Sequence, residues 1–550
     1  AQSADVMYLC HPSHPVQKLS RTGHTAWTLT DVDFQNGPFM DHNISTTTLA
    51  AGHTAVGSSG NLTLSSTTGV NNDQGWLSTD VGRLVHFKDG HYKITARTSA
   101  TVAVAICIAS PSSGSASTDF ALGSFSDTTG HPSCVTFFEQ RLVFAATLSQ
   151  PQTLFFSKSG DYENMDDNYH GTVADDDAII YTIASNQVNA IRFMTATRTL
   201  IIGTAGGEFA VSGGGTDIAI TPTNILIKKQ SNNGAANVDA LAVGNATLFL
   251  QRAKRKLREL AYNFDVDGYI APDLTILAEH ISEGGFKQLS YQQEPNQIIW
   301  CVRNDGQLVG LTYQREQQVV AWHRHIFGGS AVCESVATIP TDDSEYQTWV
   351  INKRTINGST KRYIEYMHNY DFDETDDTSF NFLDSQLSYD GSPATTISGL
   401  SHLEGEEVSI LADGATHPNK TVSSGEITLD RSASKVKVGL PYTSLLQTMR
   451  IDAGSQNGTS QSKTKRIYEI TIRLYESIGV EVGPDLNNME RIPFRSSADE
   501  MDEGVNVFTG DKEVEFRGNY ETDGFIVIRQ TQPLPLTILS LYPKLQTNDG

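Results

Sequence analysis

The residues of this 550-residue chain that most readily do chemistry are histidines and carboxylates in short clusters. His323 and His325 stand two apart, so on a strand both imidazoles point to one face, and His11 and His14 form a second close pair. A zinc site needs three or four convergent ligands, and no helical H-x-x-x-H spacing or C-x-x-C pair completes either group. We expect no metal site, with a metal at 323–325 kept as an alternative.

Two acidic clusters could hold a cation or supply the paired carboxylates of glycoside hydrolysis. One sequence does not show whether two carboxylates stand at the separation that this chemistry requires. We interpret both clusters as solvated acidic turns. The six candidate acids are Asp175, Asp176, Asp177, Asp373, Asp376 and Asp377.

The remaining motifs are incomplete. The segment 263–274 begins like an EF-hand calcium loop, but Leu274 stands where the bidentate Glu belongs, which favours a hairpin turn. The glycine-rich stretches 203–207 and 213–215 lack the G-K-[ST] end of a P-loop, and no G-x-S-x-G elbow occurs. We therefore expect no cofactor and no enzymatic activity.

One dense basic segment stands out in an acidic chain, in which 40 Lys and Arg against 63 Asp and Glu give a net charge of −23. A general nucleic-acid wrapper is excluded, because phosphate binding needs a cationic face. The segment could meet an acidic neighbouring subunit or a DNA backbone, or it is an ordinary solvated face. Its basic residues are Arg252, Lys254, Arg255, Lys256 and Arg258.

The cysteines and the apolar runs argue against a disulfide-bonded protein and against a membrane-spanning one. The five cysteines are scattered without a C-x-x-C pair, which favours buried free thiols. The longest purely apolar run, 102–109, is far shorter than a membrane span. We expect no membrane-spanning segment.

The elements that must position these groups follow a repeat. Short apolar runs recur about every fifty residues, a period typical of propeller blades. A polar turn and a second β-rich run follow each of them, and Asn-Gly and Asp-Gly pairs in the connectors indicate hairpins. The runs centre on Val143, Ile201, Phe249, Ile299 and Trp349.

The repeat predicts an all-β chain with a β-propeller platform, a small inserted β module and a C-terminal β-sandwich or barrel. Helix is expected only at 252–260 and 272–280. The predicted parts are a first blade at 1–40, the insertion at 41–130, the other blades at 131–367 and the C-terminal domain at 368–550.

Long motifs in a fixed order extend over nearly the whole chain. They include QSADVMYLCHPSHPVQKLS from residue 2, FFEQRLVFAATLSQ from residue 137 and NQIIWCVRNDGQLVGLTYQ from residue 296. These stretches resemble the tail nozzle proteins (tail tubular protein B type) of short-tailed, podovirus-type bacteriophages. The insertion, with LSTDVGRLVHF from residue 77, resembles the small FCCH-like β module, without any motif for ubiquitin chemistry.

The resemblance implies a structural virion protein that forms a homo-hexameric conduit at the distal end of the tail. Implied partners are the portal-proximal adaptor ring, a tailspike or tail fibre, a tail needle or plug, and double-stranded DNA that passes without sequence-specific binding. The implied location is the virion tail, assembled in the bacterial cytoplasm. Relatives carry a region before the QSAD motif, so we expect a preceding N-terminal partner region. The family pattern contains no catalytic residues.

The excess of acidic over basic residues suits a conduit for DNA. A negative lumen repels phosphates over a Debye length of roughly 8 Å, so we expect some of the six candidate acids to face the channel. The alternative function is a carbohydrate-binding or carbohydrate-degrading β-propeller of a phage or secreted system. It would use surface acids and aromatics such as Tyr162, Trp322 and Trp349.

Overall fold

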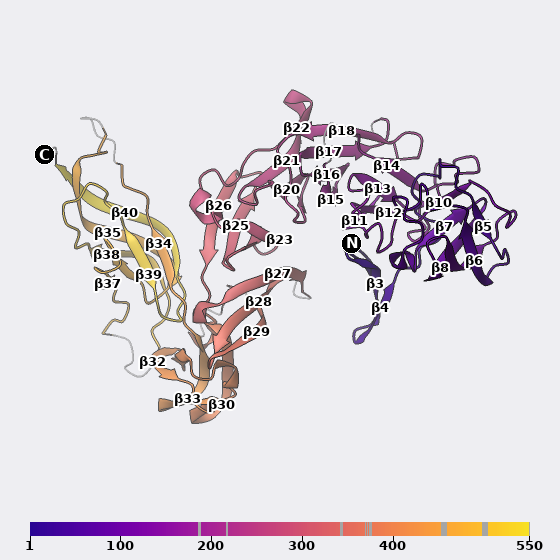
Figure 1. The fold of residues 1–550 in the computed structure, drawn as a ribbon. Coiled ribbons are helices and arrows are strands. Elements are labelled where there is room, and N and C mark those ends of the chain that lie inside the picture. Colours follow the sequence, from indigo (N-terminus) through magenta and orange to yellow (C-terminus); the bar gives the residue numbers. More distant parts are fainter. Residues whose placement is uncertain are drawn as a thin grey trace. The chain divides into compact units, whose positions relative to one another are not determined.

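The chain folds almost entirely as antiparallel sheet, which confirms the predicted all-β class (Figure 1). The computed structural model describes residues 1–184, 189–215, 218–341, 345–368, 370, 372, 377–452, 459–497 and 504–548. It divides into two compact units, 1–289 and 290–550, and each is described by itself. Among the described residues, no helix has the length and apolar character to cross a membrane.

Besides the sheet of the inserted segment, the described part of the first unit contains four sheets that are each a four-stranded meander in sequence order. The first two are β1 (Gln2–Ser3), β2 (Val6–His11), β3 (His14–Gly23) and β4 (Ala26–Asp31), then β11 (Cys134–Phe138), β12 (Arg141–Ala145), β13 (Thr153–Phe156) and β14 (Ile179–Thr182). The next two are β15 (Ile191–Ala196), β16 (Leu200–Thr204), β17 (Gly207–Ser212) and β18 (Leu226–Ser231), then β19 (Leu241–Val243), β20 (Ala246–Leu250), β21 (Leu257–Asn263) and β22 (Gly268–Ile270).

Side-chain alternation explains why the middle strands are apolar throughout. On β12, Leu142 and Phe144 pack against the sheet of β1–β4, whereas Val143 packs against the sheet of β15–β18. On β16, Ile201 packs in turn against Phe249 of β20. A strand with a sheet on each face has no solvent side, so its apolar run is continuous. This face-to-face stacking of meanders is β-propeller-like.

The second unit continues the pattern. The sheet β23 (Phe286–Gln292), β24 (Ile298–Arg303), β25 (Leu308–Gln314) and β26 (Val319–His325) is followed by the three-stranded β27 (Val332–Pro340), β28 (Tyr346–Ile356) and β29 (Ser359–Tyr366). β23 spans the division between the units. Trp300 and Val302 of β24 pack with Val336 of β27, so these two sheets share a core.

Both predicted helix candidates are wrong. Residues 252–260 form a turn and the start of β21, because Lys254 adopts φ +63°, which no right-handed helix accommodates. Of residues 272–280, only the end enters a helix, the single turn α1 (Glu279–Ser282). The other described helical turns are 3-10: η1 (Ser78–Asp80), η2 (Phe264–Val266), η3 (Gly328–Ser330), η4 (Asp377–Ser379) and η5 (Ser401–Leu403).

The inserted segment forms its own six-stranded sheet between β4 and β11, in the order β10-β7-β8-β9-β6-β5. Its core centres on fully buried Trp76, Phe87 and Tyr92. The strands are β5 (Leu49–Ala51), β6 (Ser59–Leu64), β7 (Leu84–Phe87), β8 (Gly90–Arg97), β9 (Val102–Ala109) and β10 (Phe120–Leu122).

The C-terminal region has two β cores where the sequence predicts one domain. The first sheet has the order β30-β33-β31-β32, with β30 (Asp384–Ser398), β31 (Glu407–Ala412), β32 (Ala415–Thr421) and β33 (Glu426–Leu440). The second core joins two sheets. They contain β34 (Ser444–Gln447), β39 (Val527–Gln530), β36 (Glu481–Gly483) and β37 (Glu490–Arg491), and then β38 (Phe508–Glu515), β35 (Thr464–Ser477) and β40 (Thr537–Asn548).

Candidate metal centre in the inserted module

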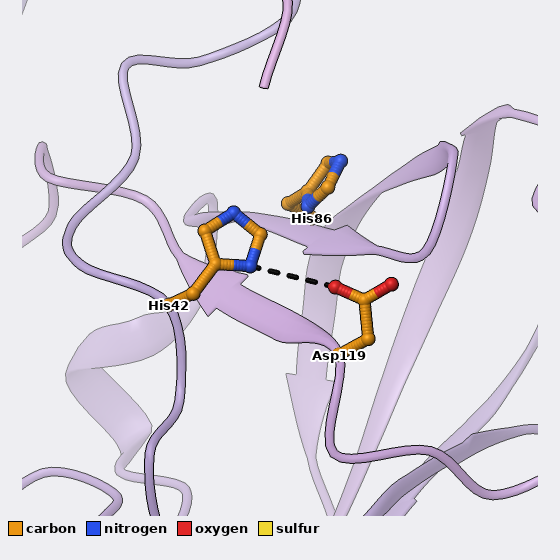
Figure 2. A group of neighbouring side chains, drawn as sticks. All are labelled: His42, His86 and Asp119. Carbon is orange, nitrogen blue, oxygen red and sulfur yellow. Dashed lines mark ion pairs between the residues drawn. The ribbon is translucent and has the colours of Figure 1, made fainter. Parts of the chain in front are cut away.

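Three potential metal ligands from distant parts of the sequence meet on one face of the inserted module. On β7, Val85 and Phe87 point into the module core, so His86 between them points to the opposite face. Asp119 directly precedes β10, which pairs with β7, and His42 lies in the segment that leads into the module. Figure 2 shows the three side chains turned toward one another.

The distances suit shared coordination of an ion. His42 Nδ1 lies 3.5 Å from Asp119 Oδ1, and one ligand atom from each of His42, His86 and Asp119 lies within 4.8 Å of the others (Figure 2). His170 approaches from the loop between β13 and β14, with Nε2 3.5 Å from Asp119 Oδ2. We call His42, His86, Asp119 and His170 the histidine cluster.

Aromatic rings cover the cluster. Tyr169 stacks on His42 at 3.5 Å between ring centroids, and His170 stacks on His86 at 5.2 Å. On the other side, His91 lies 5.1 Å from His86 and stacks on Phe39 at 5.3 Å. This cover makes His86 a buried imidazole, although it points away from the module core.

The electrostatics keep the buried imidazoles neutral. Burial, followed by the neighbouring imidazoles, lowers the pKa of His86 to about 3. Burial also lowers the pKa of His42, partly offset by Asp119. His86 Nδ1 is buried and has no hydrogen-bond partner. A neutral imidazole nitrogen with a free lone pair is the form that binds a metal.

A buried ion pair supports the strands that carry the cluster. The Arg83 and Asp80 side chains are fully buried, with Nη1 and Oδ1 2.8 Å apart. Arg83 Nε donates to the carbonyl of Gly123, just after β10, and Asp80 accepts from the backbone N–H of Leu77. The pair thus ties the start of β7 to the end of β10.

The six candidate acids do not form one group. Asp177 is buried, with Oδ1 2.7 Å from Lys158 Nζ and Oδ2 accepting from the Ala174 N–H, so its carboxylate has an internal structural role. That some of the other candidate acids face a channel stays a prediction. Asp175 and Asp176 are exposed, and their backbone carbonyls accept from Arg141. The last three candidates lie elsewhere: Asp373 and Asp376 are outside the described residues, and Asp377 begins η4.

The predicted basic patch is split between solvent and internal partners. Arg252 and Arg255 are exposed in the turn between β20 and β21. Lys256 instead lies 2.8 Å from Asp273, and Arg258 donates to the carbonyl of Ala271. Lys254 is half-buried in the same turn. Lys256 and Arg258 therefore connect β21 to the loop that follows β22.

His323 and His325 do lie on one face of β26, as predicted. Their Nδ1 and Nε2 atoms are 2.8 Å apart, and both rings contact Trp300 edge to face. Burial lowers the pKa of His325 to about 3. Within the described part of the chain, the potential three-ligand group is at His42, His86 and Asp119, not here.

Other sequence candidates have local structural roles. The Asn263 side chain caps η2 by accepting from the backbone N–H groups of Asp265 and Val266, as a turn does. The His11 and His14 rings contact each other across the β2–β3 turn, with their centroids 5.0 Å apart and their planes tilted by 35°. All five cysteines are free, four of them buried and Cys10 half-buried.

The second unit contains a shallow hollow of about 380 Å³ beside β29 and the loop before β31. Lys361, Tyr363 and Glu404 contribute to its lining. Both Glu404 carboxylate oxygens accept backbone N–H groups, from Ser424 and Gly425. Glu404 is therefore committed to the loop, and glycoside hydrolysis with a pair of carboxylates is not supported in this hollow.

Sequence reasoning missed the histidine cluster. Its members stand at 42, 86, 119 and 170, so no spacing motif links them. The available signal was His86 between the core residues of an apolar strand, where alternation places a polar side chain on the opposite face.

Comparisons with known proteins give no family. No family model matches the chain, and no curated protein is similar to it. Among solved structures, a luciferin-regenerating enzyme is similar at 10% identity and TM-score 0.18, over 40% of this chain and 82% of the other. An exo-β-1,3-galactanase from Phanerochaete chrysosporium is similar at 7% identity and TM-score 0.21, over 74% and 95%.

These comparisons require one correction. Both solved proteins are named as enzymes, which contradicts the expectation that the chain has no enzymatic activity, and that expectation is withdrawn. Likeness at these TM-scores carries no argument for a particular reaction.

Proposed function

We propose that this β-propeller-like protein is a nozzle component of a short phage tail, which assembles with copies of itself into a conduit for DNA. The long motifs that resemble tail nozzle proteins support this role, together with the predicted order of repeat, insertion and C-terminal β region. The net charge of −23 fits a passage that releases DNA.

The observation that carries the proposal is the outer strand of the first sheet, which pairs with β3 on one side only. β4 is an edge strand, and all six of its residues are exposed. Trp27 and Leu29 on this strand are 54% and 55% exposed. An exposed edge with large apolar side chains is a template for pairing with another chain, and assembly would cover it.

The test is the oligomeric state of the purified chain, measured by mass photometry and negative-stain microscopy. We expect rings of the wild-type chain and mostly monomers of Trp27→Ser. Leu277→Ser is the matched control, because Leu277 is 92% exposed but lies outside any strand. A wild-type chain that stays monomeric at high concentration would contradict the proposal.

The second candidate is a carbohydrate-binding β-propeller. The hollow at Lys361, Tyr363 and Glu404 offers an aromatic ring beside polar groups, which suits a sugar. Binding and digestion assays on host polysaccharide test this candidate. A monomer that binds glycan, and loses binding in Tyr363→Ala, would favour it over the nozzle.

A further inference from the structure

We propose that the histidine cluster is a zinc site that fastens the inserted module to the loop between β13 and β14. His42, His86 and Asp119 supply three ligands, and His170 supplies the fourth. The proposal is independent of the nozzle function, since it rests on these four residues alone.

The ligand spacing matches tetrahedral zinc better than it matches hydrogen bonding. Two ligand atoms that are each about 2.05 Å from a tetrahedral ion stand about 3.4 Å apart. His42 Nδ1 lies 3.5 Å from Asp119 Oδ1, and His170 Nε2 lies 3.5 Å from the other carboxylate oxygen, Asp119 Oδ2. A well-formed hydrogen bond of this type is about 2.7–3.2 Å long. The side chains thus leave the space that an ion would fill.

The donor set also selects the ion. Imidazole nitrogens with one carboxylate oxygen suit zinc and related borderline metals, whereas calcium and magnesium prefer sites made of oxygens. His86 is 6% exposed, and its Nδ1 has no hydrogen-bond partner. A buried polar atom without a partner is costly, and a metal bond to this ring would offset that cost.

A bound ion would join parts that are distant in sequence. His86 lies on β7 of the module sheet, and Asp119 directly precedes β10 of the same sheet. His42 lies in the segment that leads into the module, and His170 lies in the loop between β13 and β14 of the next meander. Tyr169 and His170 are among the more exposed residues of that loop. Coordination would fix the loop to the module and add stability to the first unit.

Zinc binding to the untagged, metal-stripped full-length chain tests the proposal by isothermal titration calorimetry, with cobalt(II) absorption as a second readout. We expect one tight equivalent of zinc, an intense visible band typical of tetrahedral cobalt, and little response to calcium or magnesium. Asp119→Asn should weaken zinc binding about 100-fold, as expected for the loss of a ligand.

Asp127→Asn is the matched control. Asp127 also lies beside a histidine, His131, at 3.0 Å, but no third potential ligand joins this pair within the described part of the chain. His170→Gln provides an exposed ligand variant that keeps the buried part of the module intact. The proposal is overturned if the wild-type chain binds no zinc, or if Asp119→Asn and Asp127→Asn bind it equally well.

Discussion

Two pairs of close histidines, His42–His86 in the first unit and His323–His325 in the second, have different chemical potential. The second pair lies on one strand, with its rings against Trp300 and each other. The first pair joins two segments and faces the carboxylate of Asp119. Two imidazoles at strand spacing supply only two ligands, whereas a zinc site needs three or four. A third ligand, brought from another segment by folding, makes the difference.

The largest expected effect comes from breaking the buried ion pair that supports the strands around the histidine cluster. Asp80→Ala leaves the guanidinium of Arg83 buried without its carboxylate, which should lower the free energy of unfolding by about 3–5 kcal/mol. Zinc affinity should fall as well, because β7 and β10 lose their tie. Denaturant unfolding and zinc titration measure both effects.

Asp430→Ala is the control for that substitution. Its carboxylate pairs with Lys420 at the surface, where solvent screens the pair, so the loss of stability should be much smaller than that of Asp80→Ala. Equal losses for the two variants would show that the buried pair does not hold the module.

The second prediction concerns a substitution that adds a third ligand beside His323 and His325. Thr312 Oγ1 lies 3.4 Å from His323 Nε2, on the neighbouring strand β25. Thr312→Asp should therefore create a zinc site from this pair, with affinity raised about 100-fold over the wild-type pair, or roughly 2.7 kcal/mol. The measurement is zinc titration in an Asp119→Asn background. Thr312→Asn, which has the same shape without the charge, should not bind.

The third prediction concerns pH. The folded-state pKa of His325, about 3, lies below the ordinary value of 6.5, so the unfolded chain takes up a proton that the folded chain refuses as the pH falls below 6.5. Stability should fall by roughly 1–2 kcal/mol between pH 7 and pH 5. Urea unfolding at several pH values measures this slope.

His325→Gln should flatten that slope, because glutamine does not titrate. His24→Gln removes an exposed histidine and should leave the slope as it is. If both variants change the slope equally, the burial of His325 is not its cause.

The smallest effect is expected for the tyrosine ring that covers the histidine cluster. Tyr169→Ala removes the ring that stacks on His42, and should weaken zinc binding only a few-fold, by about 0.5–1.5 kcal/mol. Tyr169→Phe keeps the ring and should bind as the wild type does. A loss of binding in Tyr169→Phe would assign the tyrosine hydroxyl, and not its ring, to the site.

Much of the fold could be predicted because strands and turns depend on the pattern of apolar and turn-forming residues within short segments. The apolar runs centred on Val143 and Ile201 are middle strands that pack against a sheet on each face, and the run centred on Phe249 is a buried middle strand of the next meander. Their regular recurrence in the sequence therefore predicts the meanders. The helix predicted at 252–260 failed because a left-handed turn residue, Lys254, leaves no such pattern. Charge alone also does not reveal that Asp177 is buried and paired with Lys158, which lies 19 residues away in the chain.

The sequence by itself determined the all-β class, the hairpin repeat and the acidic balance, because strand period, turn chemistry and charge are properties of neighbouring residues or simple sums. Only the tertiary structure decided which side chains meet. His42, His86, Asp119 and His170 become neighbours because the module sheet, its entry segment and a loop of the next meander share one face. Convergence of ligands across more than a hundred residues is a property of packing, which a linear pattern does not encode.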